Sequence, residues 1–156
     1  MSDRASASIT IGGTLPRWKL PDLFHALALE GALTDFDEAP FEEKDFEAGK
    51  PLRVACHELA WGVFETLESF CRKQGLSYIR RSDGCQGAFS AERVVYAGEG
   101  EPQSFDINDE GDLVMSLHAI RRLVTLDAIE AHFAVAAREP EPLNITDAYP
   151  LAATID

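Results

Sequence analysis

Cysteine is scarce in this 156-residue chain, and its few copies match neither a disulfide framework nor a metal knuckle. Cys56, Cys71 and Cys85 are odd in number and lie 15 and 14 positions apart. A zinc site of the common kind needs closely spaced ligand pairs such as Cys-x2-Cys, and the sequence has none. We therefore expect reduced thiols, as in cytoplasmic proteins, and neither a metal site nor a cofactor.

Long apolar runs are also missing from the sequence. No stretch approaches the ~20 apolar residues that a helix needs to cross a bilayer. The first 13 residues contain one arginine but no apolar run of the kind found in signal peptides. These absences predict a cytoplasmic protein that does not bind membranes.

Basic residues are few: 14 Lys and Arg stand against 27 Asp and Glu, which gives a net charge of −13. The main basic features are two doublets, Arg80–Arg81 and Arg121–Arg122. A protein of this charge is repelled by nucleic acid phosphates, and two doublets do not make a nucleic-acid footprint. We expect no direct binding to nucleic acid.

What the chain does have is acid, gathered in two segments. Residues 35–47, the first acidic segment, hold seven acids and one lysine, and residues 99–112, the second acidic segment, hold six acids and no base. The remaining 129 residues are nearly neutral. Such segments are attracted to basic surfaces, including those that normally hold nucleic acid. The residues that we predict to contact a protein partner are Asp35, Phe36, Asp37, Glu38, Phe41, Glu42, Glu43, Asp45, Phe46, Glu47, Glu99, Glu101, Asp109, Glu110 and Asp112.

Three phenylalanines, Phe36, Phe41 and Phe46, lie among the carboxylates of the first acidic segment. Such residues can simply hold a loop on the core. Phe41 and Phe46 are five positions apart, about 140° around a helix, so one helix face cannot bury both. We expect at least one of the three rings to stay partly exposed and to add an apolar contact to the acidic surface.

Hydrophobic periodicity predicts an α+β fold in a single domain over residues 1–156. The expected elements are a strand at 8–13, a helix at 21–30, a short helical turn at 41–48, a strand at 51–59, a helix at 59–75, strands at 76–82, 92–98, 103–108 and 112–117, and helical residues 118–139. We interpret them as a split β-α-β (ferredoxin-like) core that is extended by a β-meander and a C-terminal helix. The sheet is expected to be mixed or antiparallel, with helices mainly on one face, a flexible tail at 1–6 and an extended tail at 140–156.

Capping residues mark the ends of the expected helices. Gly31 and Gly75 suit C-caps, because glycine readily adopts the left-handed conformation found there. Thr125 suits the N-cap of a second segment within 118–139. Phe64, Leu67 and Cys71 share one face of the helix at 59–75 and are expected to be buried.

Residues 106–117 resemble a calcium loop in their acidic spacing. Asp106, Asn108, Glu110 and Gly111 occupy the first, third, fifth and sixth places, but Leu117 stands where a bidentate glutamate is needed. A hairpin turn at 108–112, with Gly111 at positive φ, accounts for the pattern better.

Cys56, His57 and Glu58 place a thiol, an imidazole and a carboxylate in a row, and these groups can form a nucleophile, its base and an orienting acid. Neighbouring residues of a strand point to opposite faces, however, so Cys56 and His57 cannot pair with each other. We predict no catalytic residue.

These observations favour a non-enzymatic acidic binding protein that docks on the basic surface of a protein partner, including a surface that binds nucleic acid. An inhibitor or nucleic-acid mimic, such as a mobile genetic element carries, has this charge pattern. Two alternatives remain open. One is a small enzyme with a cleft near His57, Glu58 and Asp83, and the other is a homo-oligomeric accessory protein whose interface is a sheet edge or the terminal helix.

Overall fold

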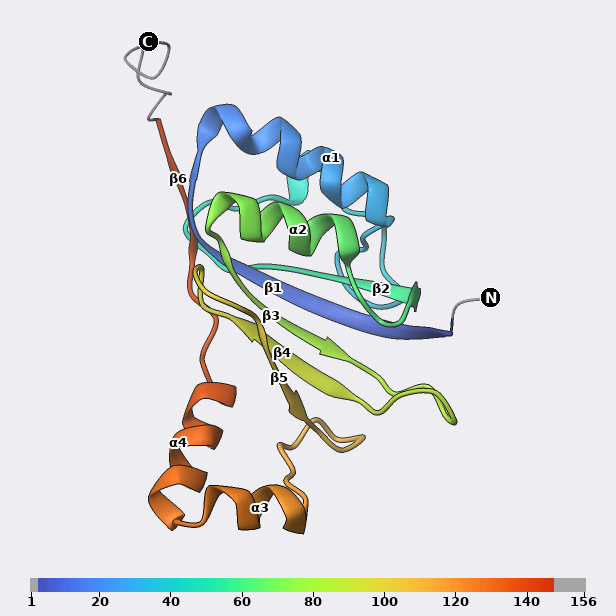
Figure 1. The fold of residues 1–156 in the computed structure, drawn as a ribbon. Coiled ribbons are helices and arrows are strands. Elements are labelled where there is room, and N and C mark those ends of the chain that lie inside the picture. Colours follow the sequence, from blue (N-terminus) through green and yellow to red (C-terminus); the bar gives the residue numbers. More distant parts are fainter. Residues whose placement is uncertain (1–2, 148–156) are drawn as a thin grey trace.

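The computed structural model describes residues 3–147, and within them the chain forms four α-helices and six strands in an α+β arrangement (Figure 1). The elements are β1 (Arg4–Pro16), α1 (Leu20–Glu30), β2 (Leu52–Ala60), α2 (Glu65–Gln74), β3 (Ser77–Ser82), β4 (Glu92–Tyr96), β5 (Gln103–Asp106), α3 (Leu117–Leu123), α4 (Leu126–Ala136) and β6 (Leu143–Thr146). Short 3-10 turns lie at Arg17–Lys19 and Glu43–Asp45.

The sheet is mixed, as the sequence predicted. Five strands run antiparallel in the order β2-β1-β3-β4-β5, and β6 pairs in parallel with the last residues of β1, from Gly13 with Leu143 to Pro16 with Thr146. The ferredoxin-like core is not confirmed, because α1 joins β1 to a strand, β2, that is its immediate antiparallel neighbour.

The main core lies between one face of the sheet and the two helices α1 and α2, which lie side by side above it (Figure 1). Ile9 and Ile11 of β1 point into this core, and both are fully buried. From α2 and the residue before it come Phe64, Leu67 and Cys71, which are fully buried as expected. The 3.6-residue spacing of these side chains is therefore what places α2 on the sheet.

The opposite face of the sheet, called the open face below, is covered only in part. α4 packs on β4 and β5 at one side of it through Val95, Phe105 and Ala136. α3 contributes no buried residue. The expectation that helices lie mainly on one face is met by α1 and α2. It is not met by α3 and α4, which lie on the side of the open face (Figure 1).

The chain between α4 and β6 crosses the sheet over Gly12. A Cβ atom at this position would collide with the backbone carbonyl of Glu141, so glycine is required there. The Ser77 hydroxyl donates to Glu141 Oε1 at 2.5 Å, and the Gly13 amide donates to the Pro142 carbonyl at 2.9 Å. These contacts bring the end of the described chain onto its first strand.

Several local predictions are confirmed and several are wrong. Gly31 and Gly75 end α1 and α2 at φ 67° and 70°, and the Thr125 hydroxyl accepts from the Ala128 amide at 3.1 Å. The prediction of a flexible tail is wrong for residues 4–6, because β1 begins at Arg4, which pairs with Ala60 of β2. Residues 1 and 2 lie outside the described residues.

Other predicted boundaries also differ from the structure. The helix predicted at 59–75 starts only at Glu65, because Leu59 and Ala60 still belong to β2. The strand predicted at 112–117 is absent: only Leu113 makes an isolated bridge, and the helical region begins at Leu117. The tail at 140–156 includes β6, and its last part, 148–156, lies outside the described residues. At residues 59–60 and 143–146 pairing with another strand decides the boundary, which local pattern does not show.

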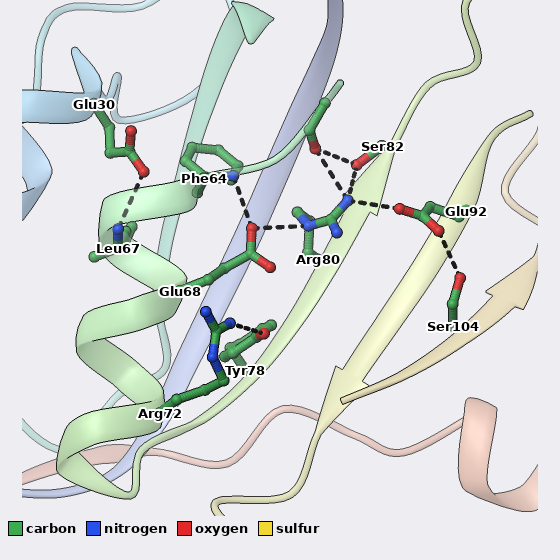
Figure 2. Close-up of polar contacts among 11 residues, drawn as sticks. Glu30, Phe64, Leu67, Glu68, Arg72, Tyr78, Arg80, Ser82, Glu92 and Ser104 are labelled. Carbon is green, nitrogen blue, oxygen red and sulfur yellow. Dashed lines mark hydrogen bonds and ion pairs between the residues drawn. The ribbon is translucent and has the colours of Figure 1, made fainter. Parts of the chain in front are cut away.

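A buried ion pair joins α2 to β3, between the helix and the sheet (Figure 2). Glu68 and Arg80 are both about 95% or more buried, and Glu68 Oε2 lies 2.9 Å from Arg80 Nε. The same Glu68 oxygen accepts from the Phe64 amide at 2.7 Å. Burial raises the pKa of Glu68, and the nearby Arg80 cation opposes that rise. The carboxylate is thus held in an apolar setting by the Arg80 cation, the Phe64 amide and the Tyr78 hydroxyl.

Arg80 extends the link to the neighbouring strand and turn. Its Nη1 donates to the Gly62 carbonyl at 3.0 Å, to Glu92 Oε1 of β4 at 3.1 Å and to the Ser82 hydroxyl. Glu92 in turn accepts from the Ser104 hydroxyl of β5 at 2.5 Å (Figure 2). One guanidinium therefore connects α2, the turn after β2, and strands β3 and β4.

Replacing Arg80 by methionine tests how much this ion pair stabilises the fold. The variant leaves Glu68 buried without its cation, and we expect the free energy of unfolding at pH 7 to fall by about 3–5 kcal/mol. The pKa of Glu68 rises further in the variant, so the folded state takes up a proton more readily than the unfolded state. The loss of unfolding free energy relative to wild type is therefore smaller at about pH 5 than at pH 7.

Urea unfolding at the two pH values measures both effects. The control is Arg81→Met, which removes the exposed arginine next along β3 and is expected to change stability by only about 0.5 kcal/mol. Equal losses in the two variants at pH 7 would show that the buried pair does not hold the fold together.

Candidate functional site

The first acidic segment forms an ordered loop along the outer edge of β2. The Leu33 amide donates to the Ala55 carbonyl at 2.8 Å, and the Phe41 amide donates to the Ala32 carbonyl at 2.9 Å. Glu42 and Asp45 form a capping box around the 3-10 turn, with the Glu42 amide donating to Asp45 Oδ2 at 2.9 Å. The loop is therefore fixed by its own backbone bonds rather than by a regular element.

All three phenylalanines of the segment are half-buried. Phe46 packs edge-on against Phe24 of α1, with ring centroids 5.8 Å apart, and Phe41 also packs on the main core. Our helical argument against burying both rings does not apply, because only Glu43–Asp45 is helical. Phe36 instead packs against the ring of His57 on β2, at a centroid distance of 5.1 Å.

The carboxylates of this loop point into solvent and differ in their partners. Asp35 pairs with Arg53 at 2.8 Å, and the hydrogen bond from Arg53 lowers the pKa of this carboxyl. Glu42 and Glu47 lie 3.2 and 2.7 Å from Lys44 and Lys50. Exposed pairs of this kind contribute little to stability.

Three carboxylates of the loop have no cation within ion-pair distance among residues 3–147, namely Glu38, Glu43 and Asp45. All three are exposed. Their charge is therefore available to an external cationic group.

The second acidic segment is divided by β5 into two loops. Glu99 and Glu101 lie between β4 and β5, whereas Asp109, Glu110 and Asp112 follow the other end of β5. All five are exposed. The segment thus offers two separate acidic loops and not one continuous surface.

The loop after β5 forms the turn that the sequence predicted at 108–112, but the second strand of the expected hairpin is reduced to an isolated bridge at Leu113. Asn108 Oδ1 accepts from the amides of Glu110 and Asp112 at 3.0 and 2.9 Å, and Gly111 has a φ of 89°. The side chains that suggested a calcium loop therefore build a turn. Within residues 3–147, no group of three or more His, Cys, Asp or Glu side chains is placed to hold a metal ion.

Arg81 connects the loop after β5 with the first acidic segment. Its Nη2 donates to the Asp109 carbonyl at 3.2 Å. It also lines a hollow of about 210 Å³ on the open face together with Ser6, Ser8, Phe36, Arg53 and Asp83. The turn at Asp109 and the tip of the first acidic segment therefore border the same part of the open face, whereas Glu99 and Glu101 do not line it.

His57 meets partners that the sequence argument did not name. Its Nδ1 lies 3.1 Å from the Ser6 hydroxyl of β1, and its Nε2 lies 3.2 Å from Asp37 Oδ1. We missed Ser6 because the tail prediction covered it. The alternation of Ala5, Ser6 and Ala7 into the following strand was the signal that could have found it.

Cys56, Glu58 and Asp83 do not converge with His57. Cys56 points to the core face, opposite to His57, and its thiol lies 3.5 Å from the Glu30 carbonyl. Burial and the charge of Glu30 raise the pKa of this thiol, which disfavours a reactive thiolate. Glu58 is exposed at a φ of 54°, and Asp83 lines the hollow without a side-chain bond to the imidazole.

Neither the family models nor the curated proteins nor the solved structures to which the chain was compared include a match. In the described part of the chain, every helix is too short or too polar to cross a membrane. Function must therefore be argued from the surface that the fold presents.

The contacts of Phe36 and His57 predict how the tip of the first acidic segment is held. In Phe36→Ala, the ring that rests on His57 is lost, and the amides of residues 34–38 are expected to exchange with deuterium about tenfold faster. The global unfolding free energy is expected to change little, because this ring lies outside the main core.

Native-state hydrogen exchange measures both quantities. Phe46→Ala is the matched variant, since its ring packs on Phe24, and it should lower global stability as well. If exchange at 34–38 is unchanged in Phe36→Ala, this ring does not anchor the tip.

Proposed function

We propose that this protein is a non-enzymatic binding protein that docks its first acidic segment on a basic surface of a protein partner. The observation that carries the proposal is the display of exposed carboxylates on an ordered backbone. Asp37, Glu38, Glu42, Glu43, Asp45 and Glu47 are all exposed, while half-buried phenylalanines hold the loop beneath them. A preorganised loop loses little conformational entropy when it binds.

The partner chemistry follows from this charge. Fixed carboxylates attract lysine and arginine side chains and raise the rate of encounter with a basic surface. The same carboxylates repel phosphate groups, so the protein competes for a nucleic-acid-binding surface and does not bind the nucleic acid itself. We therefore propose an inhibitor or nucleic-acid mimic, of the kind that a mobile element carries.

The turn at Asp109 is the part of the second acidic segment that we include in this surface. It borders the same region of the open face as Phe36, through their shared neighbour Arg81. Glu99 and Glu101 lie in the loop before β5, at the opposite end of that strand from Asp109. They serve as an internal comparison.

Charge reversal at Glu38 and Glu43 tests the proposal without disturbing the loop. Neither side chain makes a hydrogen bond or ion pair within residues 3–147, so Glu38→Lys/Glu43→Lys is expected to keep the fold. Pull-down from a cell lysate at about 0.15 M salt, where screening acts over roughly 8 Å, should lose at least about 90% of the partner that wild type captures.

The control is Glu99→Lys/Glu101→Lys, which changes the net charge by the same amount on another loop. It should retain the partner, and high salt should release the partner from wild type. Equal retention by both variants would rule out the first acidic segment as the docking surface.

A second candidate function is that of a small hydrolase, and the chain of bonds from Ser6 through His57 to Asp37 favours it. In such a site the Ser6 hydroxyl attacks an ester carbonyl and passes its proton to His57. Asp37 then pairs with the imidazolium, and the leaving alcohol takes up the proton before water releases the acyl group. Arg53 and Arg81 line the adjoining hollow, which suits an ester with an anionic group.

Hydrolysis of p-nitrophenyl acetate decides this candidate. Ser6→Ala is expected to lower the rate by at least about 100-fold, as is His57→Ala. Ser8→Ala is the control, because Ser8 lines the same hollow without contacting His57. A wild-type rate no higher than that of Ser6→Ala would exclude the hydrolase.

A further inference from the structure

Large apolar side chains are exposed mainly around α3 and α4. Of the nine that the described chain exposes, six lie between residues 114 and 135. Val124 is 81% exposed, Leu126 68% and Leu117 59%. A concentration of apolar surface of this kind marks an interaction site more often than scattered residues do.

On α3 these side chains form one stripe. Leu117 and Ile120 follow the i, i+3 spacing that places residues on a single helix face, and Val124 follows directly after the last residue of α3. None of the three is buried within residues 3–147, so the stripe stays exposed to solvent. Leu126 continues the apolar surface at the first residue of α4.

Val124 occupies a backbone conformation that its side chain disfavours. Its φ is 70° and its ψ is −46°, although β-branched residues strongly avoid positive φ. Such strain at an exposed corner contributes nothing to the core. The positive φ makes the corner between α3 and α4 and leaves the Val124 side chain in solvent. Strain of this kind is typical of binding surfaces.

The charges that flank the apolar stripe are complementary between the two helices. Arg121 follows Ile120 on α3, and Glu130 lies one helical turn after Leu126 on α4. Neither side chain has an ion-pair partner among the described residues. α3 thus presents an apolar stripe with a free cation, and α4 presents an apolar residue with a free anion.

We propose that this surface binds a second copy of the same chain. In a two-fold dimer, α3 of each copy packs against α4 of the other, so that Arg121 meets Glu130 of the partner copy twice. The exposed side chains of Leu117, Ile120, Val124 and Leu126 in both copies are then removed from water. Within residues 3–147, β6 extends toward the opposite end of the molecule from α3 (Figure 1).

Sedimentation velocity across a concentration series, from micromolar to millimolar, tests this proposal on the full chain. Wild type is expected to pass from one copy to two. Val124→Asn removes the central apolar side chain and tolerates positive φ better than valine, so the fold should be kept. We expect the dissociation constant of the dimer to rise by at least about tenfold, because each dimer loses two buried valines.

The matched control is Val135→Asn, which makes the same change at an exposed valine nine positions after Leu126, on the other side of α4. It should leave the dimer unchanged. Sedimentation as a single copy at every concentration overturns the proposal, as does an equal effect of the two valine variants.

Charge exchange provides a second test that does not depend on the valines. Arg121→Glu and Glu130→Arg should each weaken the dimer, because each places like charges together twice. An equal mixture of the two variants should restore it as a mixed dimer, in which every contact again joins a cation and an anion. Failure of the mixture to associate better than either variant alone would contradict the α3-to-α4 arrangement.

Discussion

The Glu68–Arg80 ion pair is the constraint on which the rest of the structure depends. Arg80 also donates to the Gly62 carbonyl, so the turn after β2 is fixed by the same guanidinium that binds α2. β2 in turn carries Ala55 and His57, which hold the first acidic segment. A buried charge has few alternative arrangements that satisfy it, and this fixes the position of an edge strand that would otherwise be free to shift.

The proposed surfaces lie at the two sides of the molecule. The first acidic segment runs along β2 at one edge of the sheet, and α3 and α4 lie beyond β5 at the other (Figure 1). The first acidic segment therefore does not compete with the helices for space, whereas the turn at Asp109 lies in the chain between β5 and α3. A dimer formed through the helices carries two acidic loops, and a partner with two basic sites is bound more tightly by such a dimer than by one copy.

The helices of the main core and several caps could be predicted from the sequence, because each depends on residues close together in the chain. The spacing of Phe64, Leu67 and Cys71 and the glycines at 31 and 75 belong to this group. The sheet order could not be predicted, since the pairing of β1 with β2, β3 and β6 joins distant segments. For the same reason the charge map located the acidic segments but not their separation by β5, and it gave no sign of the partners of His57.

The parallel pairing of β1 with β6 has a consequence for the order of events during protein synthesis. Gly13 pairs with Leu143, a residue that is made 130 positions later. At a translation rate of about 5–20 residues per second, residues 13–16 of β1 wait roughly 7–26 seconds for β6. β1, the first strand of the described chain, is thus among the last to be completed, and the nascent chain carries an unpaired strand edge that a chaperone can shield.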